Sequence, residues 1–277
     1  MPINKTKMSV IITKYYRLTL LTLVALCMFS CSKQTAEQES ELSLRLSCEQ
    51  SFLSSKSGEG SVTVNRLHYF VFAEGESTPL ISGQTEFNPT GTNNLKLRLF
   101  KDKAYEIAFW ACGSSAPYSF DSGTVSLPDA SGTASAPAAL SANDPGLEAF
   151  YAKVSITGGQ GSLSVSLKRA VAKVSVSLSN ALTGAASSSL SFDSAHKSFS
   201  LLDGEVSDDL STLNFSSASC PDTQNVAYAY IFAPQDQAHS CTMTLKVLDG
   251  TGTELLSTAL SNIPVQRNIQ TNIKYNN

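Results

Sequence analysis

The chain has 277 residues and a formal net charge of −3, from 20 Lys plus Arg against 23 Asp plus Glu. Neither sign dominates, so the composition argues against a protein that coats nucleic acid, and no nucleic-acid partner is expected. Only 16% of the residues are charged and 43 are Ser, which suits an exported, β-rich surface protein, and 42% hydrophobic residues suffice for a buried core.

The first 30 residues have the pattern of an export signal. Residues 1–17 carry four basic residues and no acid, and an apolar run follows at 18–30. As a helix, that run would reach only about 20 Å, which is short of the roughly 30 Å hydrocarbon core of a membrane. A permanent transmembrane helix is therefore not expected.

The apolar run ends at Met28-Phe29-Ser30-Cys31, which resembles the lipobox of bacterial lipoproteins. In that motif a peptidase cuts before a Cys that already carries diacylglycerol. The resemblance predicts a signal peptide over 1–30, lipid on Cys31, and a polar tether over 31–41. Ordinary secretion, with Cys31 as an unmodified thiol, is the alternative.

From residue 42 onward, apolar residues mostly alternate with period two, which predicts strands. In the first half we expect strands at 42–48, 62–72, 95–99 and 105–111, and a hairpin of 150–156 with 163–167 across the glycines at 158–161. The 105–111 segment (YEIAFWA) is apolar on both faces and should be a central, covered strand. Residues 113–145 are predicted to form a long excursion with few large apolar residues.

At 168–172 the alternation changes phase, because apolar residues move from odd to even positions. A bulge or a crossing between sheets would absorb the extra residue. We place a domain boundary here, between an N-terminal domain at 42–170 and a C-terminal domain at 171–277. Strands are expected at 172–179, 226–233, 242–248, 255–260 and 268–275, whereas 180–225 is Ser-rich and weakly patterned. The fold class is therefore all-β, with sandwiches rather than alternating strands and helices.

The other cysteines are Cys48, Cys112, Cys220 and Cys241, besides one in the signal peptide. An oxidising periplasm would permit a Cys220–Cys241 disulfide, and burial of all four as small apolar residues is equally consistent with the sequence. With three His and no CxxC motif, no metal site and no cofactor are expected.

No enzymatic motif stands out, so no catalytic residue is predicted. A nucleophile elbow, a zinc-protease HExxH motif and a phosphate-binding P-loop are all absent from the sequence. Glycan binding on exposed aromatic side chains is the alternative function, with Trp110, Tyr118 and Phe120 as its candidates. Burial of these three in the core or over a sheet edge is the competing interpretation.

Several segments, in this order, resemble the fimbrillin-like proteins of Bacteroidota, which are subunits and anchors of type V pili. The most specific segments are LKRAVAKV at 167–174, IPVQRN at 263–268 and TNI at 271–273. The lipobox, the strand at 42–48, FVF at 70–72, YEIAFWA at 105–111 and AFY at 149–151 accompany them. The resemblance covers most of residues 31–277.

The resemblance implies two tandem β-sandwich domains of transthyretin-like or Greek-key type in a lipid-anchored protein of the outer-membrane surface or fimbrium. Its partners would be other fimbrial subunits, the outer membrane through lipid on Cys31, and a host protein or glycan. In such proteins a trypsin-like protease removes the first strand, and a strand from another subunit fills the groove.

Applied to this chain, the removed plug strand would carry Leu42, Leu44, Leu46 and Cys48. Cleavage at Lys56 would release all of it, and cleavage at Arg45 would release only half. An anchor or tip protein could keep its lipid and its first strand. Asp193-Ser194-Ala195 also resembles the acceptor pattern of Bacteroidota O-glycosylation, which makes Ser194 a candidate.

Overall fold

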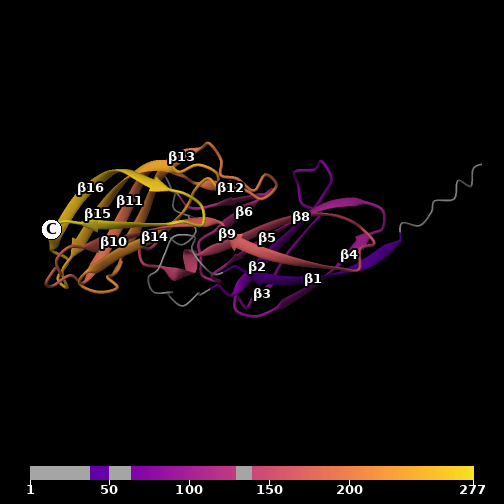
Figure 1. Ribbon diagram of the computed structural model, residues 1–277, viewed down its shortest axis with the longest axis horizontal. Helices are drawn as coiled ribbons and strands as arrows, with labels where there is room; N and C mark the ends of the chain where they lie inside the picture. The colour runs from indigo at the N-terminus through magenta and orange to yellow at the C-terminus, as the bar shows by residue number, and fades with distance from the viewer. Residues whose placement is uncertain (1–37, 50–63, 129–138) are drawn as a thin grey trace, which may run out of the picture. The chain divides into compact units, whose positions relative to one another are not determined.

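The computed structural model describes residues 38–49, 64–128 and 139–277 (Figure 1). The predicted signal peptide, Cys31 and Lys56 lie outside these ranges. Described strands run from Glu39 to Tyr275, and the helical element among them is one 3-10 turn at Pro145–Leu147. No helix in these ranges is long and apolar enough to cross a membrane. The all-β prediction is confirmed.

The first sheet is built from the N-terminal half of the chain. Its order is β3-β2-β5-β8-β9-β1-β4. The bounds are β1 Glu39–Cys48, β2 Arg66–Ala73, β3 Ile81–Glu86, β4 Asn93–Phe100, β5 Ala104–Cys112, β8 Ala149–Thr157 and β9 Ser162–Arg169. The predicted tether is therefore shorter than expected, since β1 begins at Glu39.

The first sheet folds into a sandwich because β8 and β9 pair only at Phe150–Arg169 and Tyr151–Lys168. The layer β4-β1-β9 therefore separates from β3-β2-β5-β8, and one apolar cluster fills the space between them. The predicted strands at 150–156 and 163–167 and the turn between them are confirmed, but their antiparallel pairing is confined to these two residue pairs. The two strands follow one another in the chain but lie in different layers.

The second sheet has the order β16-β15-β11-β14-β10-β17, and β13 pairs with β11. The bounds are β10 Val171–Leu178, β11 Ser187–His196, β13 Leu210–Ser219, β14 Asn225–Phe232, β15 His239–Leu248, β16 Glu254–Val265 and β17 Gln270–Tyr275. It bends where β11 meets β14 at a single pair, His196 and Phe232. The sequence pattern missed β11 and β13 in the Ser-rich 180–225 segment.

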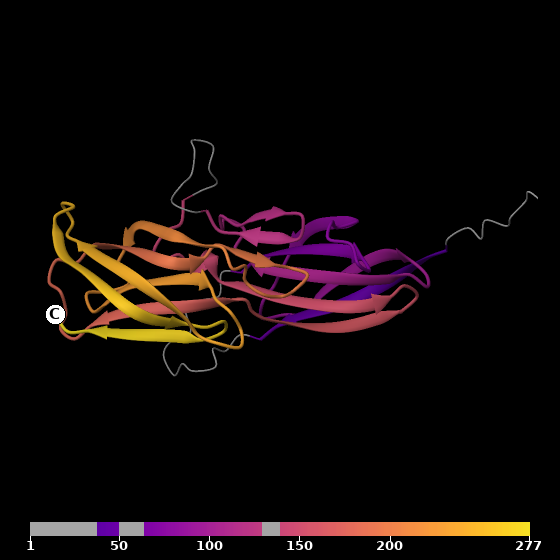
Figure 2. The same ribbon diagram turned by 90° about the horizontal axis from the view of Figure 1, so that it is seen from above.

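A small third sheet joins the two halves of the chain. It contains β6 Ser119–Asp121, β7 Thr124–Ser126 and β12 Ser198–Ser200. Two elements of the predicted excursion at 113–145 are thus strands, and Val125 within it is fully buried. Figure 2 shows this region beside both halves.

The chain passes from the first sheet to the second between Arg169 and Val171, where the change of phase predicted a bulge or a crossing. The apolar cluster of the second sheet, to which Phe232 of β14 belongs, also includes Trp110 of β5 from the first sheet. β5 therefore faces one cluster with Phe109 and the other with Trp110, which confirms that 105–111 is a central, covered strand. The division into domains at 170/171 stays a prediction.

Candidate functional site, the first strand and its groove

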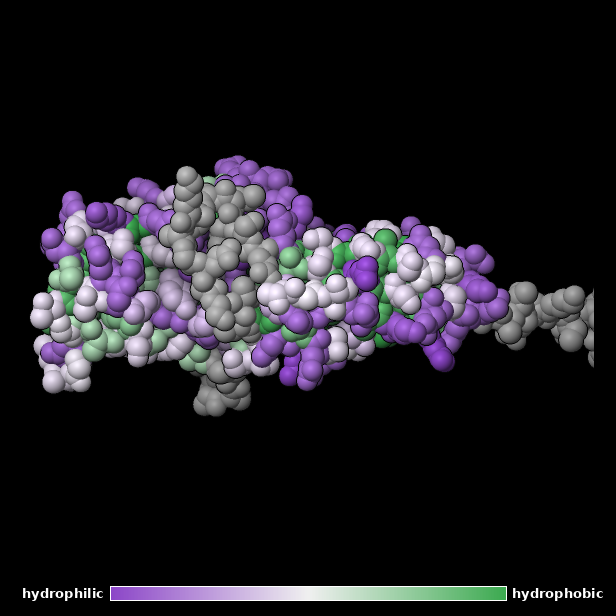
Figure 3. Space-filling view, turned by 60° about the horizontal axis from the view of Figure 1, so that its bottom comes forward, coloured by the Kyte–Doolittle hydropathy of each residue, from purple (hydrophilic) through white to green (hydrophobic). Residues whose placement is uncertain are grey.

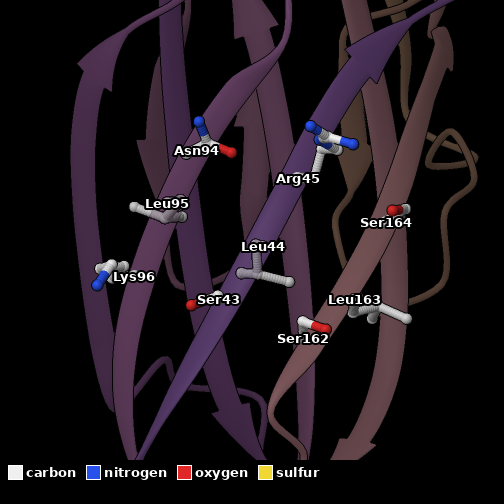
Figure 4. Close-up of a pocket in the computed structure, with 9 residues that line it drawn as sticks. All are labelled: Ser43, Leu44, Arg45, Asn94, Leu95, Lys96, Ser162, Leu163 and Ser164. Carbon is white, nitrogen blue, oxygen red and sulfur yellow. The ribbon is translucent and has the colours of Figure 1, made fainter.

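Strand β1 lies in the middle of its layer, between β4 and β9 (Figure 4). It pairs antiparallel with β4 from Glu39–Phe100 to Leu46–Asn93. On its other edge it pairs parallel with β9, from Ser43–Ser162 to Cys48–Leu167. Both edges of β1 are thus hydrogen-bonded. β1 is the first described strand in the chain, yet it lies inside the sheet and not at its edge.

The inner face of β1 carries three leucines that are almost completely buried. Leu42, Leu44 and Leu46 are 2%, 1% and 0% exposed. Leu44 lies level with Leu95 of β4 and Leu163 of β9, so the three side chains share one face of the layer. At about 1.5–3 kcal/mol for each buried leucine, the strand contributes roughly 5–9 kcal/mol of gross apolar burial.

The outer face of β1 is polar. Arg45 is exposed and lies level with Asn94 and Ser164, and these residues help to line a shallow cavity of about 400 Å³ over the three strands (Figure 4). Lys96 and Glu41 form an exposed ion pair of 2.8 Å across β1 and β4. It holds the pKa of Glu41 below its ordinary value through the hydrogen bond and charge of Lys96. Because the pair is exposed, it adds little to stability.

Strand β4 depends on β1 for its place in the sheet. Among the described strands, β1 is the one that pairs with β4, and β4 forms the edge of the layer. Loss of β1 would therefore open a slot between β4 and β9, rather than merely shorten an edge. It would also expose two rows of unpaired backbone groups and the apolar cluster beneath.

The structure describes two residues of the predicted plug strand and its processing sites in detail, Arg45 and Cys48. Arg45 lies within a ladder paired on both edges, which shields its backbone from a protease. Cys48 is half-buried rather than fully buried, and burial raises the pKa of its thiol to about 12. The backbone N–H of Glu49 donates to the Leu167 carbonyl at 2.9 Å and extends the pairing past the end of β1. Cleavage at either predicted site stays a prediction.

The predicted Cys220–Cys241 disulfide is not formed, and all four described cysteines are free. The Cys220 N–H donates to the carbonyl of Ala186, just before β11, whereas the Cys241 sulfur lies 3.8 Å from the Ser194 carbonyl oxygen near its other end. Eight residues of strand at roughly 3.3 Å each separate these positions by about 26 Å. A disulfide needs Cα atoms about 4–7 Å apart. The alternative prediction, burial of the cysteines as small apolar residues, holds for Cys112 and Cys241.

Ser194, the candidate O-glycosylation site, lies in a bulge of β11. Its φ of 58° is left-handed, and the register of β11 against β13 shifts between Phe192 and Ala195. The bulge leaves Ser194 exposed, while its carbonyl accepts a hydrogen bond from His239 Nε2 at 2.6 Å. Its modification stays a prediction.

The three aromatic residues proposed for glycan binding do not form an exposed platform. Trp110 is 0% exposed and contacts Phe199 and Phe232. Tyr118 is 8% exposed, and its hydroxyl donates to the Leu147 carbonyl at 2.6 Å. Phe120 stacks on His68 with ring centroids 4.2 Å apart. The competing interpretation, burial of these side chains, is the one that the structure supports.

Two motifs that carry the family resemblance meet in space. Arg169 is buried and donates from Nε to Glu148 at 2.7 Å and from Nη1 to Asn268 at 3.2 Å. Arg267, also buried, donates to Glu205 and stacks over the Phe199 ring at 5.4 Å. The sequence marked the basic residues, but nothing in it identified Glu148 as a partner. Within the described ranges there is no group of three or more metal-ligating side chains.

A family model described as "Family of unknown function (DUF6562)" matches residues 32–276. No curated protein sequence matches the chain. Its structural neighbours include a fimbrial assembly protein from Parabacteroides distasonis, with 14% identity and a TM-score of 0.47, over 86% of this chain and 91% of that one. The fimbrial anchor protein Mfa2 from Porphyromonas gingivalis is another, with 14% identity and a TM-score of 0.46, over 80% and 83%.

Proposed function

This chain belongs to the DUF6562 family, and we propose that it is a cell-surface fimbrial lipoprotein that acts in pilus assembly, anchoring or adhesion through strand addition. The fimbrial role is the one that the sequence resemblance implies. Lipid on Cys31 would hold the protein on the outer membrane. Assembly would use the slot that β1 occupies between β4 and β9.

One observation carries the proposal: β1 fills a slot inside its layer, and among the described strands it is the one that pairs with both β4 and β9. A strand that replaces β1 must be extended over about eight residues and apolar at every second position, because it must cover the cluster that Leu42, Leu44 and Leu46 now cover. Backbone pairing on both edges would then supply affinity, and the leucine positions would supply specificity.

Strand β17 is a candidate for the donor within this chain, although its six residues are fewer than the eight that β1 pairs with β4. It lies at the edge of the second sheet and pairs parallel with β10, from Lys173–Gln270 to Leu178–Tyr275 (Figure 2). Its Ile273 and Tyr275 pack against the core but stay half-buried. β17 therefore has less to lose than β1 when it separates from its own sheet.

Two roles follow from the fate of β1. A protein that keeps β1 and its lipid would serve as an anchor or tip. A protein cut after Lys56 would be a polymerising subunit with an open slot, whereas a cut after Arg45 would free only the first half of β1.

The test starts with the intact mass and N-terminal residue of the protein taken from the cell surface. A mass beginning at Cys31 plus acyl chains favours the anchor role, and an N-terminus at Ser57 favours the subunit role. Purified protein cut at Lys56 is then incubated with intact protein, and native mass spectrometry reports the complexes. If complexes form with intact protein but do not form with its Leu44→Asp variant, β1 of the intact protein is the strand that is added.

A variant ending at Arg267 separates the two possible donors. If it folds as a monomer and no longer assembles, β17 is the donor. Release of β1 without capture of any strand, from cut protein that stays folded, would refute the proposal.

A further inference from the structure

A second cavity, of about 620 Å³, lies where the chain passes from β9 to β10. Residues from β8 and β9, the turn at 203–205, and segments near 235 and 266–269 line it. Its volume is within the range of small-molecule sites, roughly 300–1,000 Å³. None of the leucines of β1 lines this cavity.

Two arginines make one wall of the cavity rigid. Arg267 donates to the Gly204 carbonyl, to Glu205 at 2.8 Å and to Gln235 at 2.7 Å. Arg169 is held by Glu148 and Asn268. Both guanidinium groups thus fix the polar side chains around them, which lowers the ordering cost of binding.

Several polar atoms on this wall have no hydrogen-bond partner within the described part of the chain. They are the amide nitrogens of Gln235 and Asn268, the amide oxygen of Gln266, Oδ1 of Asp203 and Nζ of Lys168. The cavity therefore presents both donors and acceptors. Hydroxyl groups, which both donate and accept, suit such a mixture.

The charges around the cavity cancel. Four cationic and three anionic side chains line it, and Glu148 behind Arg169 is a fourth anion. The lining side chains are Lys153, Lys168, Arg169, Arg267, Glu49, Asp203 and Glu205. A balanced site has no net attraction for a free anion or cation, and its polar wall does not suit a lipid chain.

We propose that this cavity binds a neutral saccharide of one or two rings. Sugar hydroxyls would pair with Asp203, Gln235, Gln266 and Lys168. Tyr151, which lines the cavity half-buried, offers an aromatic surface to the apolar face of a sugar ring. Figure 3 shows one face of the molecule, on which hydrophobic residues lie in separate areas between hydrophilic ones.

The test is a panel of neutral sugars, comprising glucose, galactose, mannose, N-acetylglucosamine, lactose and cellobiose, added to the full chain. Saturation-transfer NMR finds binders, and calorimetry measures their Kd at ~50 mM and ~500 mM salt. We expect binding that changes less than about twofold with salt. Because each direct hydrogen bond contributes about 1 kcal/mol, Lys168→Ala with Gln235→Ala should weaken binding at least about tenfold.

Lys96→Ala is the matched control, since Lys96 is an exposed lysine on the same sheet that does not line this cavity. Circular dichroism and the Tm check that each variant is folded. Asp203→Ala alone provides a second variant that leaves Arg267 and its partners in place. Any of three results overturns the proposal: no neutral sugar binds at millimolar concentration, binding survives both variants, or only sialyllactose binds and high salt abolishes it.

Discussion

Nη1 of Arg169 lies 3.2 Å from Oδ1 of Asn268, a residue 99 positions further along the chain. The contact joins the LKRAVAKV and IPVQRN segments on which the family resemblance depends. Asn268 takes a left-handed φ of 59°, a conformation that asparagine tolerates better than most residues. The Asn268 N–H also donates to the carbonyl of Val171, at the start of β10. The two segments are therefore parts of one structural junction between the sheets.

Arg169→Met should cost about 3–5 kcal/mol of unfolding free energy, because it leaves the buried Glu148 carboxylate without its charged partner. Urea unfolding at neutral pH measures the loss. Lys96→Met breaks the exposed pair with Glu41 and serves as the control, with no measurable change expected. Equal effects of the two substitutions would contradict the role given to burial.

Leu44→Ala should destabilise the protein by about 2–5 kcal/mol, since Leu44 is 1% exposed between Leu95 and Leu163. Arg45→Ala, one residue along the same strand, should change stability by less than about 0.5 kcal/mol because its side chain is exposed. Chemical unfolding of full-length protein compares them. Similar losses at both positions would mean that β1 is not seated as described.

Gly158→Ala should destabilise the turn between β8 and β9. A Cβ there would lie 1.8 Å from the Phe100 carbonyl oxygen, so the backbone would have to move. At Gly161, in the same turn, a Cβ would meet nothing within 4 Å, which makes Gly161→Ala the matched control. We expect a clearly lower Tm for the first variant alone. A Tm of Gly158→Ala equal to that of the unmodified protein would show that the backbone at 158 does not approach Phe100 as closely as described.

The four described thiols should remain unpaired in protein purified without reductant. Burial raises the pKa of Cys112 to about 12 and that of Cys241 to about 11, so few thiolates exist at pH 8. Iodoacetamide should therefore label them slowly in the folded protein and quickly in urea. Mass spectrometry of peptides counts the labels, and a Cys220–Cys241 crosslinked peptide would disprove the separation along β11.

Stability should fall as pH decreases from about 6.5 to about 4. Burial, helped by Arg66, lowers the pKa of His68 from 6.5 to about 4, so in this interval the unfolded chain binds a proton that the folded chain excludes. His68→Gln should flatten the dependence. Part of the slope will remain, because burial also lowers the pKa of His196. The midpoints of urea unfolding are measured across this pH interval. An unchanged dependence of stability on pH in His68→Gln would refute the role given to His68.

The sequence alone determined the fold class and most strands, because alternation with period two is a local property of each segment. It also marked the crossing at 168–172, since a change of phase requires one extra residue. It missed β3, which is an almost fully exposed edge strand, and β11, whose alternation uses Ser188 at a buried position and is broken by the bulge at Ser194. Exposed edges and buried serines lack the apolar contrast that the pattern needs.

Tertiary structure alone decided which strands meet. The parallel pairing of β1 with β9, the limitation of the β8–β9 pairing to two residue pairs and the burial of Trp110 depend on contacts between distant segments. Glu148 gained a role only when Arg169 was buried against it. Local pattern fixes which face of a strand is apolar, whereas the neighbour that covers this face is chosen by the packing of the whole sheet.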